Sequence, residues 1–577
     1  MAKQRKTAHR APSRSTEAAS SPPAWLPLLG IACLTLVAYV PALSAGWIWD
    51  DDHYVTKNPL LHNPAGLVSI WLDPTSTPQY YPLVYTTFWL EYQLWQLHPL
   101  GYHLVNVLLH AANAVLAYRV LRLLALPGAL LAAVIFSVHP VEVETVAWVT
   151  ERKNLLSTFF YLGALGSFLR YWPAEQPEPL AGANKWYLAS LFLYSAALLS
   201  KTVTCSLPAA ILLLQWWKTG RVSKRAWLLT APMFAIGAYL AALTGYLEKY
   251  HVGALGVPWN LSFADRLLIA GRALWFYLGK LAWPHNLTFI YPRWHIDTHA
   301  LRQWIFPIAF AVLIAGCLAL RRRIGRGPLV MLLLFAGTLL PALGFFDVYP
   351  MQFSFVADHF QYLASLACFA GVSALVATRL GVKAVRAVGL VAVIVLVPLT
   401  WHRIQPFRDA ESLWNDTLAK NPDAWMAHNN LATLLAQQGR LAEAAKHGSQ
   451  VVALNPSDAP GHSNLAVQLA RLGRNREAEQ QFREALRLRP DYAEAHYNYG
   501  NLLVKEEKYA AAKDEYQRAI HDDPHLGQAH NNLAALLMAE HKPAEAAKHF
   551  KAAIAAGLPG TEVRRNLAEA LRLLDQN

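Results

Sequence analysis

Three consecutive aspartates, Asp50, Asp51 and Asp52, follow shortly after the apolar run 24–43. Adjacent like charges repel one another, and burial beside a membrane adds a desolvation cost, so both effects raise carboxylate pKa values. A carboxylate with a raised pKa is suited to act as a general base. We predict that Asp51 is the base, supported by Asp50, and that Asp52 points to water. The alternative is a solvated acidic turn that ends a membrane span.

Three basic residues, Arg152, Lys153 and Lys201, also lie beside apolar runs. A guanidinium offers a planar fork to phosphate oxygens, and an ammonium offers a compact point charge. Lys201 lies between two apolar runs with almost no loop, where a lone cation is costly without an anionic partner. We predict that the three residues hold a donor phosphate. For Arg152 and Lys153, the alternative is ion pairing with Glu151 within a loop.

Four further ionisable residues lie at the edges of apolar runs: His139, Glu144, Asp358 and His359. We predict that they orient a donor or an acceptor molecule. For His139 and Glu144 an equally good interpretation is that they cap a short helix. Carboxylate oxygens are also hard ligands, so a divalent cation at Asp50, Asp51 and Asp52 is a further possibility.

The composition is that of a membrane protein. Of 577 residues, 54% are hydrophobic and 15% are charged, whereas soluble proteins carry about 25% charged residues. The net charge of +13 comes from short basic clusters between apolar runs, which is typical of cytoplasmic loops and not of nucleic-acid binding. We predict an all-α membrane bundle of about eleven spans. They lie near 24–43, 101–124, 127–141, 154–172, 185–200, 203–217, 226–247, 304–320, 329–346, 360–379 and 383–400.

The basic clusters set the expected orientation, because Lys and Arg accumulate in cytoplasmic loops. The clusters 218–225, 321–326 and 379–386 then face the cytoplasm, and 265–287 is a helix along the outer interface. The ionisable residues described above, and everything after residue 400, lie on the outer side. The predicted units are a disordered basic cytoplasmic tail (1–23), a membrane domain (24–400), a linker with a leading half-repeat (401–420), four repeats (421–556) and a capping helix (557–577).

The C-terminal part repeats every 34 residues. Pro422, Pro456, Pro490 and Pro524 follow one another at this interval, and a 34-residue period is the signature of tetratricopeptide helix–turn–helix units. Small residues recur at the positions where the two helices of a repeat pack closely. The sequence therefore predicts a superhelix of four repeats with a concave face.

A ladder of asparagines, Asn430, Asn464, Asn498, Asn532 and Asn566, shares this period. Side-chain amides at one-repeat intervals are suited to bind the main chain of an extended peptide. In "AHNNLA" (427–432 and 529–534) the repeats resemble the tetratricopeptide region of the nucleocytoplasmic O-GlcNAc transferases. The alternative is that the asparagines only contact the neighbouring repeat. Histidines two residues before four of them either make the grip pH-sensitive or are solvent-exposed polar residues.

The chain as a whole resembles the transmembrane and tetratricopeptide-repeat O-mannosyltransferases, which belong to the GT-C class of membrane glycosyltransferases. The matching features are Asp50 and Asp51 in the first outer loop, "HP" at 139–140 with Glu144, Arg152, and Lys201 after a long apolar span. The segment "ADHFQYLAS" (357–365) is similar to an acidic–Arg–Tyr motif of that family, with His359 in place of the arginine.

The resemblance implies transfer of a monosaccharide, mannose in that family, from a polyprenyl-phosphate carrier to Ser or Thr hydroxyls. It also implies that no metal is required, and that the partners are the lipid-linked donor, membrane lipids and a protein or peptide acceptor on the repeats. We expect a bacterial inner membrane with periplasmic repeats, or the endoplasmic reticulum membrane in a eukaryote. The alternatives are a membrane-anchored scaffold for envelope assembly or secretion, and a transporter of a lipid-linked sugar.

Overall fold

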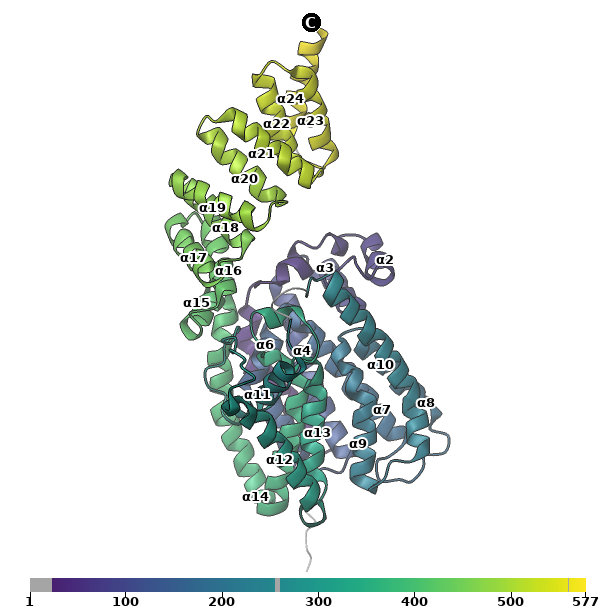
Figure 1. Cartoon of the computed structure of the whole chain (residues 1–577). Coiled ribbons are helices and arrows are strands. Elements are labelled where there is room, and N and C mark those ends of the chain that lie inside the picture. Colours follow the sequence, from purple (N-terminus) through teal and green to yellow (C-terminus); the bar gives the residue numbers. More distant parts are fainter. Residues whose placement is uncertain (1–22, 255–259, 559, 577) are drawn as a thin grey trace, which may run out of the picture.

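The computed structural model describes residues 23–254, 260–558 and 560–576, so nearly all of the predicted N-terminal tail lies outside the described residues. The described residues form helices and turns, with no β-strand among them, which confirms the all-α prediction. Two parts are distinguished in Figure 1: a bundle of long apolar helices and a superhelix of short helix pairs that rises from one end of it.

The bundle is built from long helices joined by short turns. Prolines stand in the first turn of several of them, as in α4 and α9, where the missing N–H has no intrahelical partner to lose. Its helices are α1 (Leu26–Tyr39), α4 (Pro99–Leu123), α5 (Ala129–Val138), α7 (Arg152–Tyr171), α8 (Asn184–Leu198), α9 (Leu207–Thr219), α10 (Lys224–Tyr250), α12 (Leu301–Ile324), α13 (Gly327–Leu339) and α14 (Tyr362–Ile404).

Within the described residues, five helices are long and apolar enough to cross a membrane. A sixth span is possible if α5 and the following helical segment Pro140–Ala147, bent by 50°, count as one. The predicted spans 154–172, 185–200 and 203–217 correspond to α7, α8 and α9, which pack into the bundle. The figure of about eleven spans therefore stays a prediction.

The helix α14 combines two predicted spans in a hairpin. Gly381 interrupts it with a φ of 79°, a conformation that glycine adopts without steric cost. Arg403 near its end lies 3.5 Å from Asp358 just before its start, so the two halves are antiparallel. Gly381 is therefore at the far end of the bundle.

Basic clusters gather at this far end. Arg326 donates a hydrogen bond to the carbonyl of Trp217 over 3.4 Å, so the clusters 218–225 and 321–326 lie side by side. The repeats rise from the opposite end of the bundle (Figure 1). This arrangement agrees with the expected orientation, in which the basic end faces the cytoplasm.

Shorter helices cover the outer end, where the candidate site lies. The amphipathic α11 packs one face against α12 and begins with a capping box formed by Ser262 and Asp265. The other outer helices pack around the first outer loop and the start of α7. The outer helices are α2 (Pro64–Leu72), α3 (Pro82–Trp95), α6 (Val143–Ala147) and α11 (Phe263–Ala282).

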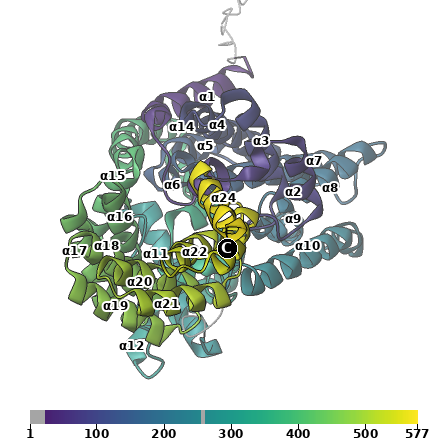
Figure 2. The ribbon, with the colours of Figure 1, turned by 90° about the horizontal axis from the view of Figure 1, so that it is seen from above.

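The repeats form a curved stack of helix pairs whose far end projects over the bundle when seen from above (Figure 2). Close packing explains the small residues: a Cβ at Gly500 would lie 2.6 Å from the ring of Tyr516. The helices are α15 (Ala410–Lys420), α16 (Trp425–Gln437), α17 (Leu441–Leu454), α18 (Ala459–Arg471), α19 (Asn475–Leu488), α20 (Ala493–Lys505), α21 (Tyr509–Asp522), α22 (Gly527–Ala539), α23 (Pro543–Ala555) and α24 (Thr561–Asp575).

The four repeat histidines are buried, so the interpretation that they are solvent-exposed is wrong. In each repeat Nε2 bonds the carbonyl of the repeat proline six residues earlier, at 2.9–3.2 Å. Nδ1 bonds a side chain nineteen residues later, on the second helix of the same repeat. These bonds clamp the two helices together. The pairs are His428–His447, His462–Gln481, His496–Glu515 and His530–His549.

The histidines that join the two helices of each repeat differ in the direction in which their pKa values are shifted. Burial lowers the pKa of His428 and of His447, and burial beside His530 lowers that of His549. Burial alone would also lower the pKa of His496, but Glu515 and the carbonyl of Pro490 raise it, because both ring nitrogens face acceptors.

We expect the first and last repeats to lose stability in mild acid. A lowered folded-state pKa means that the unfolded chain binds more protons, so stability is lost as the pH falls through the ordinary histidine pKa of about 6.5. His496 has the opposite sign and stabilises its repeat at low pH. Hydrogen exchange of the full chain, corrected for intrinsic rates, should therefore show α16–α17 and α22–α23 losing protection between about pH 7.5 and about pH 5.5, while α20–α21 does not.

The matched variant is H447Q with H549Q, which copies the glutamine of the second repeat. It should weaken the acid-induced loss in the first and last repeats and leave α20–α21 unchanged. An equal acid-induced loss of protection in the wild type and the variant would contradict this explanation.

Candidate active site

A cavity of about 300 Å³ lies at the outer end of the bundle, beneath the first repeat. Aromatic rings form much of its wall, which suits the apolar faces of a sugar ring, and a few ionisable groups point into it. The aromatic residues include Trp49, Tyr54, Trp148 and Phe289. The ionisable groups include Asp50, Glu144, Glu151, Lys153 and His359, and Met426 of α16 closes one side.

The three aspartates point in three directions. Asp50 lines the cavity. Asp51 is fully buried and accepts hydrogen bonds from the Ile48 N–H (3.0 Å), the Thr150 N–H (2.9 Å) and the Thr150 hydroxyl (2.7 Å). Asp52 faces solvent and pairs with Lys57. The predicted base, Asp51, is therefore outside the cavity lining, and its carboxylate ties the first outer loop to the segment before α7.

The aspartates also differ in acidity. Burial raises the pKa of Asp50 to about 6, against the opposing effect of Lys153. Burial raises the pKa of Asp51 to about 7, although its three hydrogen bonds favour the charged form. Partial burial would raise the pKa of Asp52, but hydrogen bonds from Lys57 and Thr56 hold it below its usual value. Asp50 is the aspartate that combines a raised pKa with access to the cavity.

Glu151 is the centre of a buried ion-pair cluster, and sequence reasoning treated it only as a partner for loop charges. Its carboxylate lies 3.1 Å from Lys153 Nζ, 3.4 Å from Lys201 Nζ and 3.9 Å from His359 Nε2. Burial alone would raise the pKa of Glu151, but His359 and the two lysines lower it to about 2. Burial lowers the pKa of Lys201 to about 8, and repulsion from Lys153 adds to this effect, although the Glu151 carboxylate opposes both.

The structure brings Lys153 and Lys201 together on Glu151, but only Lys153 is part of the cavity lining. The Lys153 ammonium also lies 5.3 Å from the Tyr54 ring and 5.6 Å from the Trp148 ring. Cation–π attraction holds it at the cavity wall. Lys201 pairs with Glu151 from a position outside the cavity lining.

Arg152 lies on another side of α7, away from the cavity. It is fully buried, and its guanidinium bonds Asn106, Thr87, Glu91 and the carbonyl of Tyr102. With its donors directed to these partners, Arg152 joins α3, α4 and α7. The geometry gives no support to a role for Arg152 in phosphate binding.

His139 and Glu144, predicted together, are separated. The Nδ1 atom of His139 accepts from the Val141 N–H over 3.3 Å, and its Nε2 atom bonds the carbonyl of Leu281. His139 therefore caps the turn Pro140–Glu142, as in the capping interpretation. Glu144 instead lines the cavity and bonds His359 Nδ1 over 2.5 Å.

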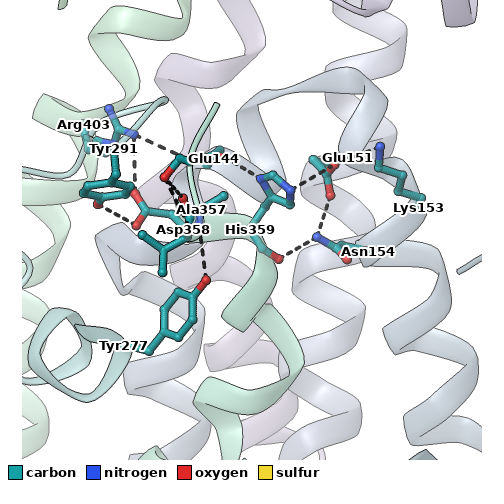
Figure 3. Close-up of polar contacts among 12 residues, drawn as sticks. Glu144, Glu151, Lys153, Asn154, Tyr277, Tyr291, Ala357, Asp358, His359 and Arg403 are labelled. Atoms are coloured by element: carbon teal, nitrogen blue, oxygen red, sulfur yellow. Dashed lines mark hydrogen bonds and ion pairs between the residues drawn. The ribbon is translucent and has the colours of Figure 1, made fainter. Parts of the chain in front are cut away.

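Asp358 and His359 join two halves of a polar row that runs from Lys153 to Arg403 (Figure 3). Asp358 accepts from the Tyr291 hydroxyl over 2.8 Å. Arg403 places one guanidinium nitrogen 3.5 Å from Asp358 and 3.8 Å from Glu144. The permanent positive charge that His359 does not provide is therefore supplied by Arg403.

Sequence reasoning missed Arg403, although the sequence held a signal for it. The residue follows the last apolar run directly, on the side where the charge rule disfavours basic residues. A cation that breaks this rule at a membrane edge is expected to have an acidic partner.

The aspartate triplet does not converge on a shared point. Across the described part of the chain, no group of three or more His, Cys, Asp or Glu side chains is placed to hold a metal ion. The geometry therefore gives no support to a cation at Asp50, Asp51 and Asp52.

The asparagine ladder is partly engaged within the repeats. Asn464 donates to Asn429 over 3.3 Å and Asn532 to Asn501 over 2.9 Å, across neighbouring repeats. Asn498 and Asn566 are half-buried. Asn430 donates to the carbonyl of Met426 over 2.9 Å, and Met426 lines the cavity. The first rung of the ladder is thus one helical turn from the candidate site.

Comparison with known proteins identifies the repeats and finds relatives that match about a third of the chain or less. The tetratricopeptide repeat family model matches residues 405–459, 464–526 and 500–561, so the C-terminal part is a tetratricopeptide-repeat domain. The chain is 32% identical over 208 residues to human "Protein O-mannosyl-transferase TMTC4", covering 31% of this chain and 28% of that protein. This chain is similar to the protein O-mannosyl-transferases.

Other relatives bear similar names. The chain is 33% identical over 183 residues to mouse "Protein O-mannosyl-transferase TMTC3" (30% of this chain, 19% of that protein) and 35% identical over 156 residues to Drosophila melanogaster "Protein O-mannosyl-transferase Tmtc1" (25% and 18%). It therefore spans less than a third of the length of each of these relatives. Two solved structures are similar to part of the chain. MamA has a TM-score of 0.24 and 19% identity, over 26% of this chain and 86% of that chain. PilW has a TM-score of 0.27 and 21% identity, over 31% of this chain and 82% of that chain.

We expect D51N to destabilise the membrane domain. An asparagine amide directs its NH₂ group at a backbone N–H on one side or the other, which leaves buried donors unpaired at a cost of about 1–3 kcal/mol. Thermal unfolding of the purified chain in nanodiscs should show a lower melting temperature. D52N, at the exposed neighbour, is the matched control and should melt like the wild type; equal melting temperatures for all three proteins would contradict this role of Asp51.

Proposed function

We propose that the chain is a membrane glycosyltransferase that moves a monosaccharide, mannose by analogy with the names of its relatives, from a polyprenyl-phosphate carrier to Ser or Thr hydroxyls of proteins. The observation that carries the proposal is the position of Asp50, an acid with a raised pKa, in an aromatic cavity that also contains Lys153. A base and a cation in one pocket match the two charges that develop in glycosyl transfer.

In the proposed reaction Asp50 takes the proton of the acceptor hydroxyl as its oxygen attacks the anomeric carbon of the sugar. The bond from that carbon to the phosphate oxygen breaks, and the electron pair leaves with the lipid phosphate. Lys153 Nζ stabilises the departing charge, while Glu151 and Lys201 fix its position. We assign the base to Asp50 and not to Asp51, whose hydrogen bonds to Ile48 and Thr150 hold the loop so that Asp50 faces the cavity.

An apolar crevice supports a lipid-linked donor. It has a volume of about 450 Å³ and lies between α4, α7, α9, α13 and α14. Leu363 and Leu366, at its outer end, follow the cavity residue His359 by one and two helical turns. A prenyl chain that fills the crevice would bring its phosphate toward the cavity, since apolar chain is favoured there and charge is not.

The repeats would present the acceptor. The asparagine ladder leads to Asn430, which bonds the cavity residue Met426. With the basic loops in the cytoplasm, the cavity and the repeats face the other side, which is the periplasm if the membrane is a bacterial inner membrane.

The test compares D50N with D52N in purified chains supplied with a polyprenyl-phosphate-linked mannose and a Ser/Thr-rich protein acceptor. Loss of the base should lower the transfer rate by about 10²–10⁴-fold in D50N, with an unchanged melting temperature, and D52N should transfer like the wild type. The wild-type rate should rise with pH, reach half of its maximum near pH 6, the pKa of Asp50, and level off once Asp50 is fully ionised.

A different result would point elsewhere. Full transfer by D50N would remove the assigned base. No transfer by the wild type, together with intact acceptor binding, would instead favour the membrane-anchored scaffold.

A further inference from the structure

Arg403 is a buried cation between three carboxylates from three parts of the chain. It is 4% exposed and lies at the end of α14. Its guanidinium is 3.8 Å from Glu144 in α6, 3.5 Å from Asp358 before α14, and 3.5 Å from Asp416 in α15. The face of the Phe407 ring lies 5.1 Å from the guanidinium carbon. Two of these carboxylates belong to the membrane domain, and the third belongs to the helix that leads into the repeats.

The charges make this arrangement interdependent. A buried carboxylate without a partner is strongly destabilised, and Glu144 is also bonded to His359 at the cavity. If α15 moved away, Asp416 would leave Arg403. The guanidinium would then be shared differently between Glu144 and Asp358. The position of α15 and the charge balance of Glu144 and Asp358 therefore both depend on the side chain of Arg403.

Neighbouring contacts seat α15 on the same region. Lys420 Nζ donates to the carbonyl of Leu287 over 2.9 Å and also pairs with Asp416 over 2.7 Å. Asn421 donates to the carbonyl of Ile290 over 3.1 Å, and Ile290 lines the cavity. The ring of Trp425, at the start of the first repeat, lies 5.3 Å from that of Phe353 in the cavity wall.

We infer that Arg403 is a positioning residue. It holds the leading helix α15 in a fixed position relative to the site acids Glu144 and Asp358. An acceptor polypeptide bound on the repeats is thereby aligned with Asp50. This inference rests on the proposed function, because it concerns how the acceptor of that reaction is placed. The inference predicts that acceptors differ by size. Transfer to a protein that binds the repeats depends on the position of α15, whereas transfer to a short Ser/Thr peptide that enters the cavity alone does not.

The test uses the full chain in nanodiscs with two acceptors, a repeat-binding protein and a short Ser/Thr peptide. D416N removes the arm from Arg403 to α15 together with the Asp416–Lys420 pair and leaves Glu144 and Asp358 in place, so KM for the protein should rise on the order of tenfold, while kcat for both acceptors and KM for the peptide stay unchanged. R403Q also affects Glu144 and Asp358 and should lower kcat for both acceptors. R403K, which keeps the charge, should restore part of the loss.

Two control variants distinguish the contact between Arg403 and Asp416 from the other contacts near α15. R408Q changes an exposed arginine five residues later, which pairs with its neighbour Asp409 and donates to the Ser412 hydroxyl over 3.5 Å but does not contact Glu144, Asp358 or Asp416, and it should behave like the wild type. K420Q removes the other partner of Asp416 and keeps Arg403; it should raise KM for the protein less than D416N does. Equal losses on both acceptors in D416N would overturn the inference.

Hydrogen exchange provides a readout without activity. In D416N and R403Q, the amides of α15 and of residues 287–291 should exchange faster than in R408Q and the wild type. If the wild type transfers no sugar but α15 still exchanges faster in D416N, the proposed function fails, whereas the role of Arg403 in holding α15 is supported. Unchanged exchange in both variants would overturn the role of Arg403.

Discussion

Glu151 is fully buried and holds the ammonium groups of two lysines and the ring of His359 within 4 Å, and the rest of the site is arranged around this charge. A buried carboxylate is stable only when opposite charges or donors surround it. Lys153 and Lys201 compensate it. His359 joins it to Glu144, and Arg403 continues the row to Asp358 (Figure 3). Arg403 also lies 3.5 Å from Asp416 of the leading helix α15. Each group contacts the next, so a row of ion pairs and hydrogen bonds connects the cavity with the leading repeat helix.

The aspartate triplet shows how neighbours in sequence take different tasks. The turn at Asp51 places its carboxylate on backbone donors of two segments, whereas Asp50 turns into the cavity and Asp52 to solvent. The desolvation predicted from the sequence does raise the pKa of Asp50 and of Asp51. Which of them reaches a substrate is decided by the direction of the side chain, and that direction depends on Thr150, about a hundred residues away.

Periodic features could be predicted well from the sequence. The 34-residue period identifies the repeats because it reflects local packing within and between neighbouring helix pairs. Apolar runs and basic loops likewise predict a helical membrane bundle with an acidic outer end. The convergence of Glu144, Glu151, Lys153, Lys201 and His359 at that end also follows from the orientation argument, since chain ends of antiparallel helices meet at one side.

Directions and partners within that end could not be predicted. Arg152 and Lys153 are adjacent, yet one points to Glu91 and the other to the cavity, because successive residues on a helix diverge by about 100°. The partners of Arg403 depend on contacts between segments far apart in the chain. No local pattern encodes these contacts.

The most direct measurement is the intact mass of a Ser/Thr-rich acceptor after incubation with the purified chain and polyprenyl-phosphate-linked mannose in nanodiscs. The account predicts that the acceptor gains one or more hexose increments in proportion to the wild-type chain, and none with D50N. An acceptor whose mass is unchanged by a folded wild-type chain and an intact donor would contradict it.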